Sequence, residues 1–155
     1  MREASPSRTT FIIELPLAEA PSTSGQSSPP DSHLRYLDGR RILLIDDDPQ
    51  VREVIAELLT LFGGEVCITA QPSQVMAMVD GEHWDLIISD YFLQEMTGLD
   101  LTAAIREAHP DTRLVLLTGW IKQSAEARAR EIVDMVLIKP LTISDIIKLS
   151  DLTSP

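Results

Sequence analysis

Several short apolar runs in this sequence end at a residue with a reactive side chain, and this pattern constrains the fold more than any other feature. The most prominent run, Leu86–Ser89, leads directly into the carboxylate of Asp90, and Gly98 closes the loop beyond it. A continuous apolar run of this length is typical of a strand buried on both faces, as in a parallel sheet covered by helices. An acid at the carboxyl end of such a strand lies where open α/β sheets bind their ligands.

Three further apolar runs end in the same way. They lead into Asp46 and Asp47 after Arg41–Ile45, into Thr118 after Arg113–Leu117, and into Lys139 after Met135–Ile138. If these strands are parallel, three carboxylates, a hydroxyl and an ammonium meet at one edge of one sheet. We expect this edge to be the functional site.

Helical patterns separate the strands, and together they predict an α/β fold. A further strand is predicted at Glu65–Thr69. The predicted helices run from Asp48-Pro49 to Gly63, from Pro72 to about Val79, from Gly98 to His109, from Gln123 to Ile132, and from Thr142 to about Leu149. These alternations predict a doubly wound (βα)5 fold with a parallel five-stranded sheet. The flavodoxin-like strand order 2-1-3-4-5 would place the first and third strands side by side, so that Asp90 faces Asp46 and Asp47.

Composition and charge exclude several classes of protein. A formal net charge of -11 over 155 residues argues against a nucleic-acid-binding surface, which needs a basic patch. The single cysteine, Cys67, excludes an intramolecular disulfide and suits a reducing cytosol. No apolar run reaches the length of a membrane span, and the first residues lack the apolar core of a secretory signal. We therefore expect a cytoplasmic protein that contacts neither nucleic acid nor membrane.

Three neighbouring carboxylates repel one another, and each raises the pKa of the others unless a cation lies among them. Carboxylate oxygens with open positions for water and phosphate oxygens suit Mg²⁺. Phosphoryl transfer needs mainly positioning and neutralisation of charge, which Mg²⁺, the Lys139 ammonium and the Thr118 hydroxyl can supply. Asp90 is the best candidate nucleophile because it stands alone at its strand end, whereas Asp46 and Asp47 are paired to hold a metal.

Over about residues 39–150 the sequence resembles the receiver domain of two-component response regulators. The matching motifs are Ile-Leu-Leu-Ile-Asp46-Asp47-Asp48-Pro49, Asp85-Leu-Ile-Ile-Ser-Asp90 with Gly98 eight positions on, Leu-Leu-Thr118-Gly119, and Lys139-Pro140. The resemblance implies phosphotransfer from a phosphohistidine to Asp90, and Mg²⁺ held by Asp46, Asp47, Asp90 and the backbone carbonyl of Phe92. It also implies that Thr118 is the switch hydroxyl, that Lys139 is the phosphate partner, and that the bond from Lys139 to Pro140 is cis.

The sequence departs from the receiver pattern at several positions. Gln94 stands where the family usually has Pro, and Val136 stands where it has a switch aromatic residue, which puts signalling by an aromatic rotamer in doubt. Phe92 and Trp120 occupy the positions, two beyond Asp90 and two beyond Thr118, that tune the attacking water in the family. We expect these bulky side chains to exclude a positioned water and slow self-dephosphorylation.

The residues before the predicted receiver domain differ in composition. Residues 7–17 look like the closing strand of a sensor histidine kinase ATPase domain, which ends in Gly-Thr-x-Phe-x-(hydrophobic)-x-Leu-Pro, although Arg8 replaces the Gly. The Ser/Pro-rich stretch that follows predicts a flexible linker. The predicted organisation is therefore a strand-like remnant at 1–18, a linker at 19–38 and a receiver domain at 39–152.

We expect this chain to be the C-terminal end of a hybrid sensor kinase, since only a short helix and a tail follow Lys139 and leave no room for an output domain. A stand-alone receiver with a disordered N-terminal tail is the alternative. The expected partner is a sensor histidine kinase or a histidine phosphotransfer protein, and the expected state is a monomer or weak dimer.

Two other functions remain open from the residues alone. A haloacid-dehalogenase-type phosphatase also combines an Asp nucleophile, a Thr, a Lys and Mg²⁺, but that family needs Asp-x-Asp-x-(Thr/Val) on its first strand. The sequence Asp46-Asp47-Asp48-Pro49-Gln50 lacks the last residue of that motif. A degenerate receiver that acts only as a docking module is the other alternative, and its intact acids and lysine count against it.

Overall fold

A computed structural model describes residues 35–120 and 123–154 of the chain, and in this part strands and helices alternate strictly. The strands are β1 (Arg41–Ile45), β2 (Glu65–Thr69), β3 (Leu86–Asp90), β4 (Leu114–Thr118) and β5 (Met135–Ile138). The helices are α1 (Pro49–Leu61), α2 (Pro72–Gly81), α3 (Gly98–Ala108), α4 (Gln123–Ile132) and α5 (Ile143–Thr153). No helix in this part of the chain is long and apolar enough to cross a membrane.

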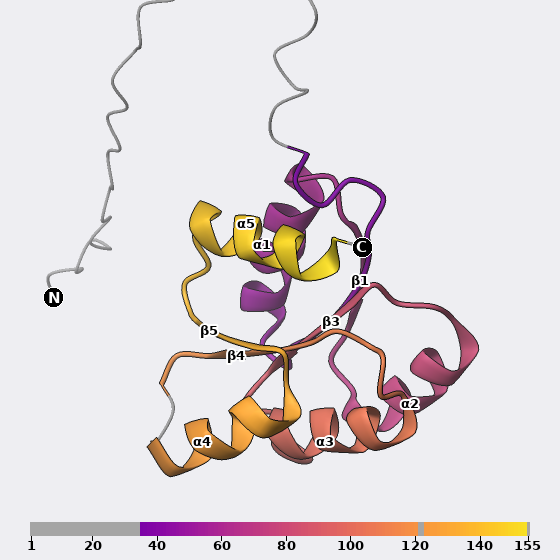
Figure 1. The fold of residues 1–155 in the computed structure, drawn as a ribbon, viewed down its shortest axis with the longest axis vertical. Helices are drawn as coiled ribbons and strands as arrows, with labels where there is room; N and C mark the ends of the chain where they lie inside the picture. Colours follow the sequence, from indigo (N-terminus) through magenta and orange to yellow (C-terminus); the bar gives the residue numbers. More distant parts are fainter. Residues whose placement is uncertain (1–34, 121–122, 155) are drawn as a thin grey trace, which may run out of the picture.

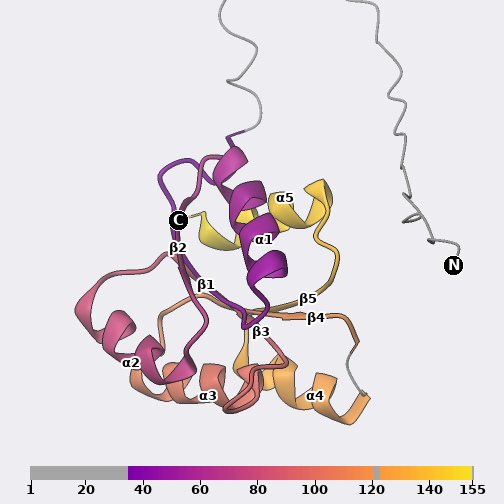
Figure 2. The same ribbon diagram turned by 180° about the vertical axis from the view of Figure 1, so that it is seen from behind.

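The strands form one parallel sheet in the order β2-β1-β3-β4-β5, which confirms the predicted topology. Helices α1 and α5 cover one face, and α2, α3 and α4 cover the other (Figure 1). The view from behind shows the same three layers (Figure 2). Because every strand runs the same way, their carboxyl ends share one edge of the sheet.

Each face of the sheet has its own apolar core. Successive side chains of a strand point to opposite faces, so Ile42 and Leu44 pack toward α1 and α5, whereas Leu43 and Ile45 pack toward the other three helices. Strands β1, β3 and β4 carry almost only aliphatic side chains because both of their faces are covered. The two cores hold the strand ends in place and so position the residues that follow them.

Polar caps begin three of the helices. The Asp48 carboxylate accepts hydrogen bonds from the Gln50 and Val51 amides and so caps α1, as the sequence predicts. Thr97 caps α3 in the same manner. Thr142 and Asp145 form a reciprocal capping box at the start of α5.

The element boundaries differ slightly from those predicted. Strands β3 and β4 include Asp90 and Thr118 themselves, because both residues still pair with the neighbouring strand. Helix α5 extends to Thr153, four residues beyond the predicted end, since Leu149 and Thr153 continue its buried face. The Thr153 hydroxyl donates to the Leu149 carbonyl and so satisfies its own polar group within the helix.

Ordered packing begins before residue 39, where the sequence places the start of the domain. Leu37 is fully buried, its amide donates to the Phe62 carbonyl, and the Tyr36 ring packs on the Phe62 ring. The predicted kinase-like strand and most of the predicted linker lie outside the described residues.

Candidate functional site

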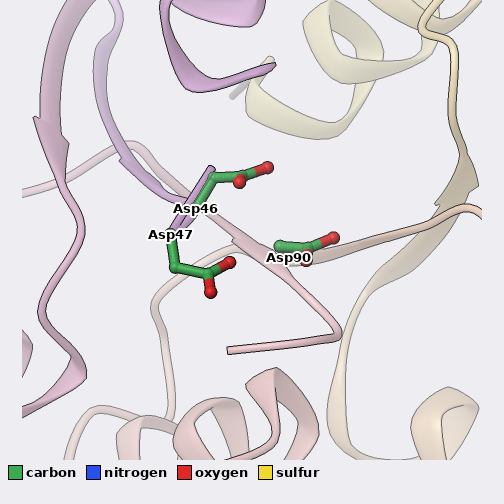
Figure 3. A group of neighbouring side chains, drawn as sticks. All are labelled: Asp46, Asp47 and Asp90. Atoms are coloured by element: carbon green, nitrogen blue, oxygen red, sulfur yellow. The ribbon is translucent and has the colours of Figure 1, made fainter. Parts of the chain in front are cut away.

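Three carboxylates gather at the carboxyl ends of β1 and β3. Asp46 and Asp47 directly follow β1, and Asp90 is the last residue of β3. The two strands are paired through Ile45 and Ser89, so the residues that follow them are neighbours. Each acid offers one oxygen, and these oxygens lie within 4.8 Å of one another. Figure 3 shows the three side chains lying side by side, which is the arrangement that the sequence predicts.

Asp46 is the most tightly held of the three acids and is only 1% exposed. Its Oδ1 accepts a hydrogen bond of 2.9 Å from the Asp48 amide, and its Oδ2 lies 2.7 Å from the Lys139 ammonium. Its backbone amide donates to the Thr69 carbonyl at the end of β2. Asp46 is therefore fixed through both its main chain and its side chain.

Lys139 comes from the end of β5 and joins two of the acids. Its ammonium lies 2.7 Å from Oδ2 of Asp46 and 2.8 Å from Oδ1 of Asp90. The other carboxylate oxygen of Asp90 accepts a hydrogen bond from the Phe92 amide. The peptide bond from Lys139 to Pro140 is cis, as the resemblance implies.

Burial shifts the pKa values at this site. Burial raises the pKa of Asp90, and the nearby charge of Asp46 adds to this rise, whereas Lys139 and the Phe92 amide only partly offset it. Burial lowers the pKa of Lys139, but its bonds to Asp46 and Asp90 outweigh that effect, so the pKa is raised overall. Lys139 is consequently protonated at neutral pH and supplies a permanent positive charge beside Asp90.

Asp47 is the acid best placed to take up a cation. Its side chain is half-buried, and it accepts none of the hydrogen bonds found in residues 35–120 and 123–154. Three carboxylates against one ammonium leave the cluster with excess negative charge, and hard oxygen ligands of this kind match Mg²⁺. The residues present therefore fit a magnesium ion.

Thr118 ends β4 next to Lys139, whose amide donates to the Thr118 carbonyl. Its side chain is completely buried, but its hydroxyl turns toward its own loop. That hydroxyl donates a 2.6 Å hydrogen bond to the Trp120 carbonyl and accepts one from the Trp120 amide. The structure thus places Thr118 at the same edge as the acids, with its hydroxyl bonded to the loop and to none of them.

The side chains of Phe92 and Trp120 project from the loops that border this edge. They are 59% and 63% exposed. Phe92 also bridges to Thr97, which closes the loop between β3 and α3. The role of the Phe92 carbonyl as a metal ligand stays a prediction.

Gly98 allows this loop to pack against the end of β3. A Cβ atom on Gly98 would lie 1.8 Å from the Asp90 carbonyl oxygen and 2.7 Å from the Ser89 hydroxyl. The Gly98 amide donates to the Tyr91 carbonyl across the same contact. A side chain at this position would therefore displace either the start of α3 or Asp90 itself.

Arg52 is a residue of the site that the sequence analysis missed. It lies in the first turn of α1, and its guanidinium donates a 2.6 Å hydrogen bond to the Asp46 carbonyl. A cation near a helix N-terminus opposes the helix dipole. That conflict, one turn beyond the acid pair, is the signal that could have identified Arg52.

Comparisons with known proteins agree with this geometry. The family model described as "Response regulator receiver domain" matches residues 42–151. Sensor protein EvgS of Escherichia coli (strain K12) is 28% identical over 145 residues, which cover 90% of this chain and 12% of that protein. A response regulator receiver protein of Anaeromyxobacter sp. (strain Fw109-5) is 30% identical over 111 residues, 71% of this chain and 47% of that one. The chain thus spans less than half of either relative.

A solved structure shows the same fold. The response regulator protein TrrA from Thermotoga maritima, in complex with Mg²⁺ and BeF, superposes with a TM-score of 0.67 at 24% identity, covering 73% of this chain and 98% of that chain. The family match spans most of the sequence and includes every residue of the described sheet except Arg41. The protein therefore belongs to the response regulator receiver domains of two-component signal transduction.

Proposed function

We propose that this domain accepts a phosphoryl group on Asp90, in a Mg²⁺-dependent reaction, from a phosphohistidine of a sensor kinase or histidine phosphotransfer protein. The observation that carries the proposal is the position of the Asp90 carboxylate, which lies against the Lys139 ammonium and beside Asp46 and Asp47. This is the set of charges that a carboxylate needs in order to attack a phosphorus atom that carries three oxygens.

In the proposed reaction an oxygen of Asp90 forms a bond to phosphorus while the phosphorus–nitrogen bond of the phosphohistidine breaks. The imidazole leaves with the electron pair of that bond, and Asp90 becomes an acyl phosphate. Lys139 balances negative charge on one phosphoryl oxygen. Asp46, Asp47, Asp90 and the Phe92 carbonyl would hold Mg²⁺, which when bound neutralises charge on the phosphoryl oxygens.

Thr118 is the proposed switch residue. Its hydroxyl donates to the Trp120 carbonyl in the structure, and a phosphoryl oxygen on Asp90 offers a stronger, charged acceptor. When the hydroxyl changes partner, the loop after β4 loses a bond that holds it. This loop leads into α4, an alanine-rich helix whose Ala129 is its one fully buried side chain among residues 125–132. Such a helix can shift at small cost in apolar contacts.

An apolar groove beside the site supports a protein as the phosphoryl donor. The groove has a volume of about 500 Å³ and runs from α1 to the loop after β5. Val51, Val54 and Leu58 line it on one side, and Pro140 and Leu141 line it on the other. Val54 is 65% exposed, so its burial by a partner would be favourable. Because Lys139 also borders the groove, a bound partner would lie next to Asp90.

The match to a sensor protein supports the proposal that this domain is part of a hybrid sensor kinase. It covers 90% of the chain and so extends into the residues before Arg35, where the kinase-like segment lies. We propose that residues 1–18 end a kinase domain, that a linker follows, and that the receiver is cytoplasmic and monomeric or weakly dimeric. Sequencing the coding region upstream of Met1 tests this, since the proposal requires ATP-binding motifs in frame.

Incubation of the domain with acetyl phosphate, with and without Mg²⁺, tests the phosphoacceptor function. The expected product is an acid-stable, hydroxylamine-sensitive phosphoprotein that forms only with Mg²⁺ and is absent in Asp90→Asn. Catalytic release of phosphate from a generic monoester would instead indicate a phosphatase. A protein that binds no Mg²⁺ and takes up no label would be a docking module only.

A further inference from the structure

Arg52 is a positively charged residue beside the acid pair that the proposed reaction does not use. It is the fourth residue of α1, after Pro49, Gln50 and Val51, where a positive charge opposes the partial charge of the helix N-terminus. Its side chain nevertheless turns back toward β1 and is half-buried. A solvated arginine would have no reason to take this direction.

The Arg52 guanidinium hydrogen-bonds to the peptide group between Asp46 and Asp47. The guanidinium donates to the Asp46 carbonyl at 2.6 Å, and this carbonyl belongs to the peptide that joins Asp46 to Asp47. The Arg52 amide also donates to the Asp48 carbonyl, as the first bond of α1. Arg52 therefore holds both ends of the short Asp46–Asp48 turn.

The rest of the turn fixes Asp46 more firmly than Asp47. Asp46 is held by the Thr69 carbonyl, the Asp48 amide and Lys139, whereas the Asp47 carboxylate accepts no hydrogen bond in the described part of the chain. The direction of the Asp47 side chain thus depends on the orientation of the peptide before it. The bond from Arg52 fixes that orientation.

We propose that Arg52 is a positioning residue, which sets the spacing of the Asp46 and Asp47 carboxylates for Mg²⁺ by holding the carbonyl between them. This inference rests on the proposed metal-binding role of the acid pair. Arg52 acts from behind the ligands and touches neither the ion nor the phosphoryl group. Groups that orient metal ligands in this way contribute strongly to affinity in other metal sites.

Positioning and charge predict opposite results when Arg52 is neutralised. As a nearby positive charge, Arg52 repels a divalent cation, so its removal would tighten Mg²⁺ binding. As a positioning residue, it keeps the carboxylates at the spacing the ion requires, so its removal weakens binding. The sign of the change in affinity therefore separates the two roles.

The test measures Mg²⁺ binding by calorimetric titration of the wild type, Arg52→Met and Arg52→Lys. Arg130→Met is the matched control, since Arg130 belongs to α4, which covers the opposite face of the sheet, and among residues 35–120 and 123–154 its one ion pair is with Glu126. We expect Arg52→Met to weaken Mg²⁺ binding about tenfold, the lower end of the loss that follows removal of a group behind a metal ligand in other sites. Arg52→Lys, which keeps a donor and the charge, should recover part of the loss.

A readout without metal accompanies the titration. Amide hydrogen exchange of Asp47 and Asp48 in the Mg²⁺-free protein should accelerate in Arg52→Met and not in Arg130→Met, while the thermal midpoint of both stays near that of the wild type. Unchanged or tighter Mg²⁺ binding by Arg52→Met overturns the inference. A wild type that binds no Mg²⁺ overturns the proposed function instead, so the two failures are distinguishable.

Discussion

The Lys139 ammonium lies 2.8 Å from Oδ1 of Asp90, yet the pKa of the acid is raised overall, because its burial outweighs the lowering effect of this contact. Burial raises the Asp90 pKa, and the charge of Asp46 raises it further. The metal-free site is therefore strained electrostatically, because two buried acids share one ammonium. Binding a cation or removing one of the negative charges therefore stabilises the site.

We predict that this strain makes the metal-free domain less stable as the pH rises. A folded-state pKa above the ordinary value near 3.8 means that folded Asp90 holds its proton to higher pH than unfolded Asp90 does. This difference adds to the free energy of unfolding at pH values below the ordinary pKa, and the contribution is lost as the pH rises through the folded-state pKa. Urea unfolding of the metal-free proteins should show Asp90→Asn gaining stability relative to the wild type as the pH rises from about 4 to 7.

Magnesium provides the control for this prediction. Since Mg²⁺ binds the folded acid cluster, it should stabilise the wild type by an amount that grows with the logarithm of one plus the ratio of its concentration to the dissociation constant. Asp90→Asn lacks one metal ligand, so Mg²⁺ should stabilise this variant less than the wild type. A pH-independent difference between the two proteins in the absence of Mg²⁺ would contradict the prediction.

Gly98 should be intolerant of even the smallest side chain. In Gly98→Ala the new methyl group would meet the Asp90 carbonyl oxygen at 1.8 Å, so either α3 or the end of β3 must move. We expect a loss of about 1–3 kcal/mol in the free energy of unfolding, as for other overpacked sites, and slower labelling by acetyl phosphate.

Gly81→Ala is the matched control. Gly81 is the last residue of α2, and a Cβ atom there would meet no atom within 4 Å. Alanine is the better helix former by up to about 1 kcal/mol, so this variant should be as stable as the wild type or more so. Equal stability of the two variants in urea unfolding would show that the contact with Asp90 is not what requires glycine at position 98.

Val54 should matter for transfer from a protein donor and not from a small one. A Val54→Glu substitution places a charge in the apolar groove beside Lys139, so it should slow transfer from a phosphorylated histidine phosphotransfer protein about tenfold. Labelling by acetyl phosphate should be unchanged, because Asp90 itself is untouched. Ala104→Glu adds the same charge to the exposed surface of α3, on the opposite side of the sheet, and should affect neither reaction.

The sheet and most of the site follow from the sequence because their signals are local. Apolar runs predict the strands, and the parallel topology then forces Asp46, Asp90 and Lys139 to one edge. The hydroxyl partner of Thr118 was not predictable, since it depends on how the next two residues turn back. The side-chain direction of Arg52 depends on tertiary packing in the same way.

Phe92 and Trp120 should prolong the lifetime of the phosphorylated state. Both residues lie two positions beyond strand ends at the carboxyl edge of the sheet, where water must approach to hydrolyse an acyl phosphate on Asp90. We expect a lifetime of many minutes in the wild type, and a several-fold shorter one when both residues are replaced by Asn, which can bind and orient a water. Loss of label after removal of acetyl phosphate measures this, and a wild-type half-life of seconds would remove the hypothesis.

The capping box of α5 predicts a loss of stability in acid that is separate from the functional site. The Lys148 ammonium and the Thr142 hydroxyl and amide bond to the Asp145 carboxylate and lower its pKa, although its burial opposes them. A lowered folded-state pKa gives stability that is present above the ordinary value near 3.8 and is lost as the pH falls below it. Asp145→Ala should therefore cost about 1 kcal/mol at pH 7, the usual contribution of a helix cap.

Comparing the stability of Asp145→Ala and the wild type at low pH tests whether the contribution of Asp145 is lost in acid. As the pH falls below about 3.8, unfolded Asp145 takes up a proton that folded Asp145 takes up only at lower pH, so the difference in urea-unfolding free energy between the wild type and Asp145→Ala should shrink. Asp151→Ala is the matched control: Asp151 is an exposed acid on the same helix, and its carboxylate makes no hydrogen bond within residues 35–120 and 123–154. That variant should differ little from the wild type at either pH. If it cost as much as Asp145→Ala at pH 7, the effect would belong to the net charge of the helix and not to its cap.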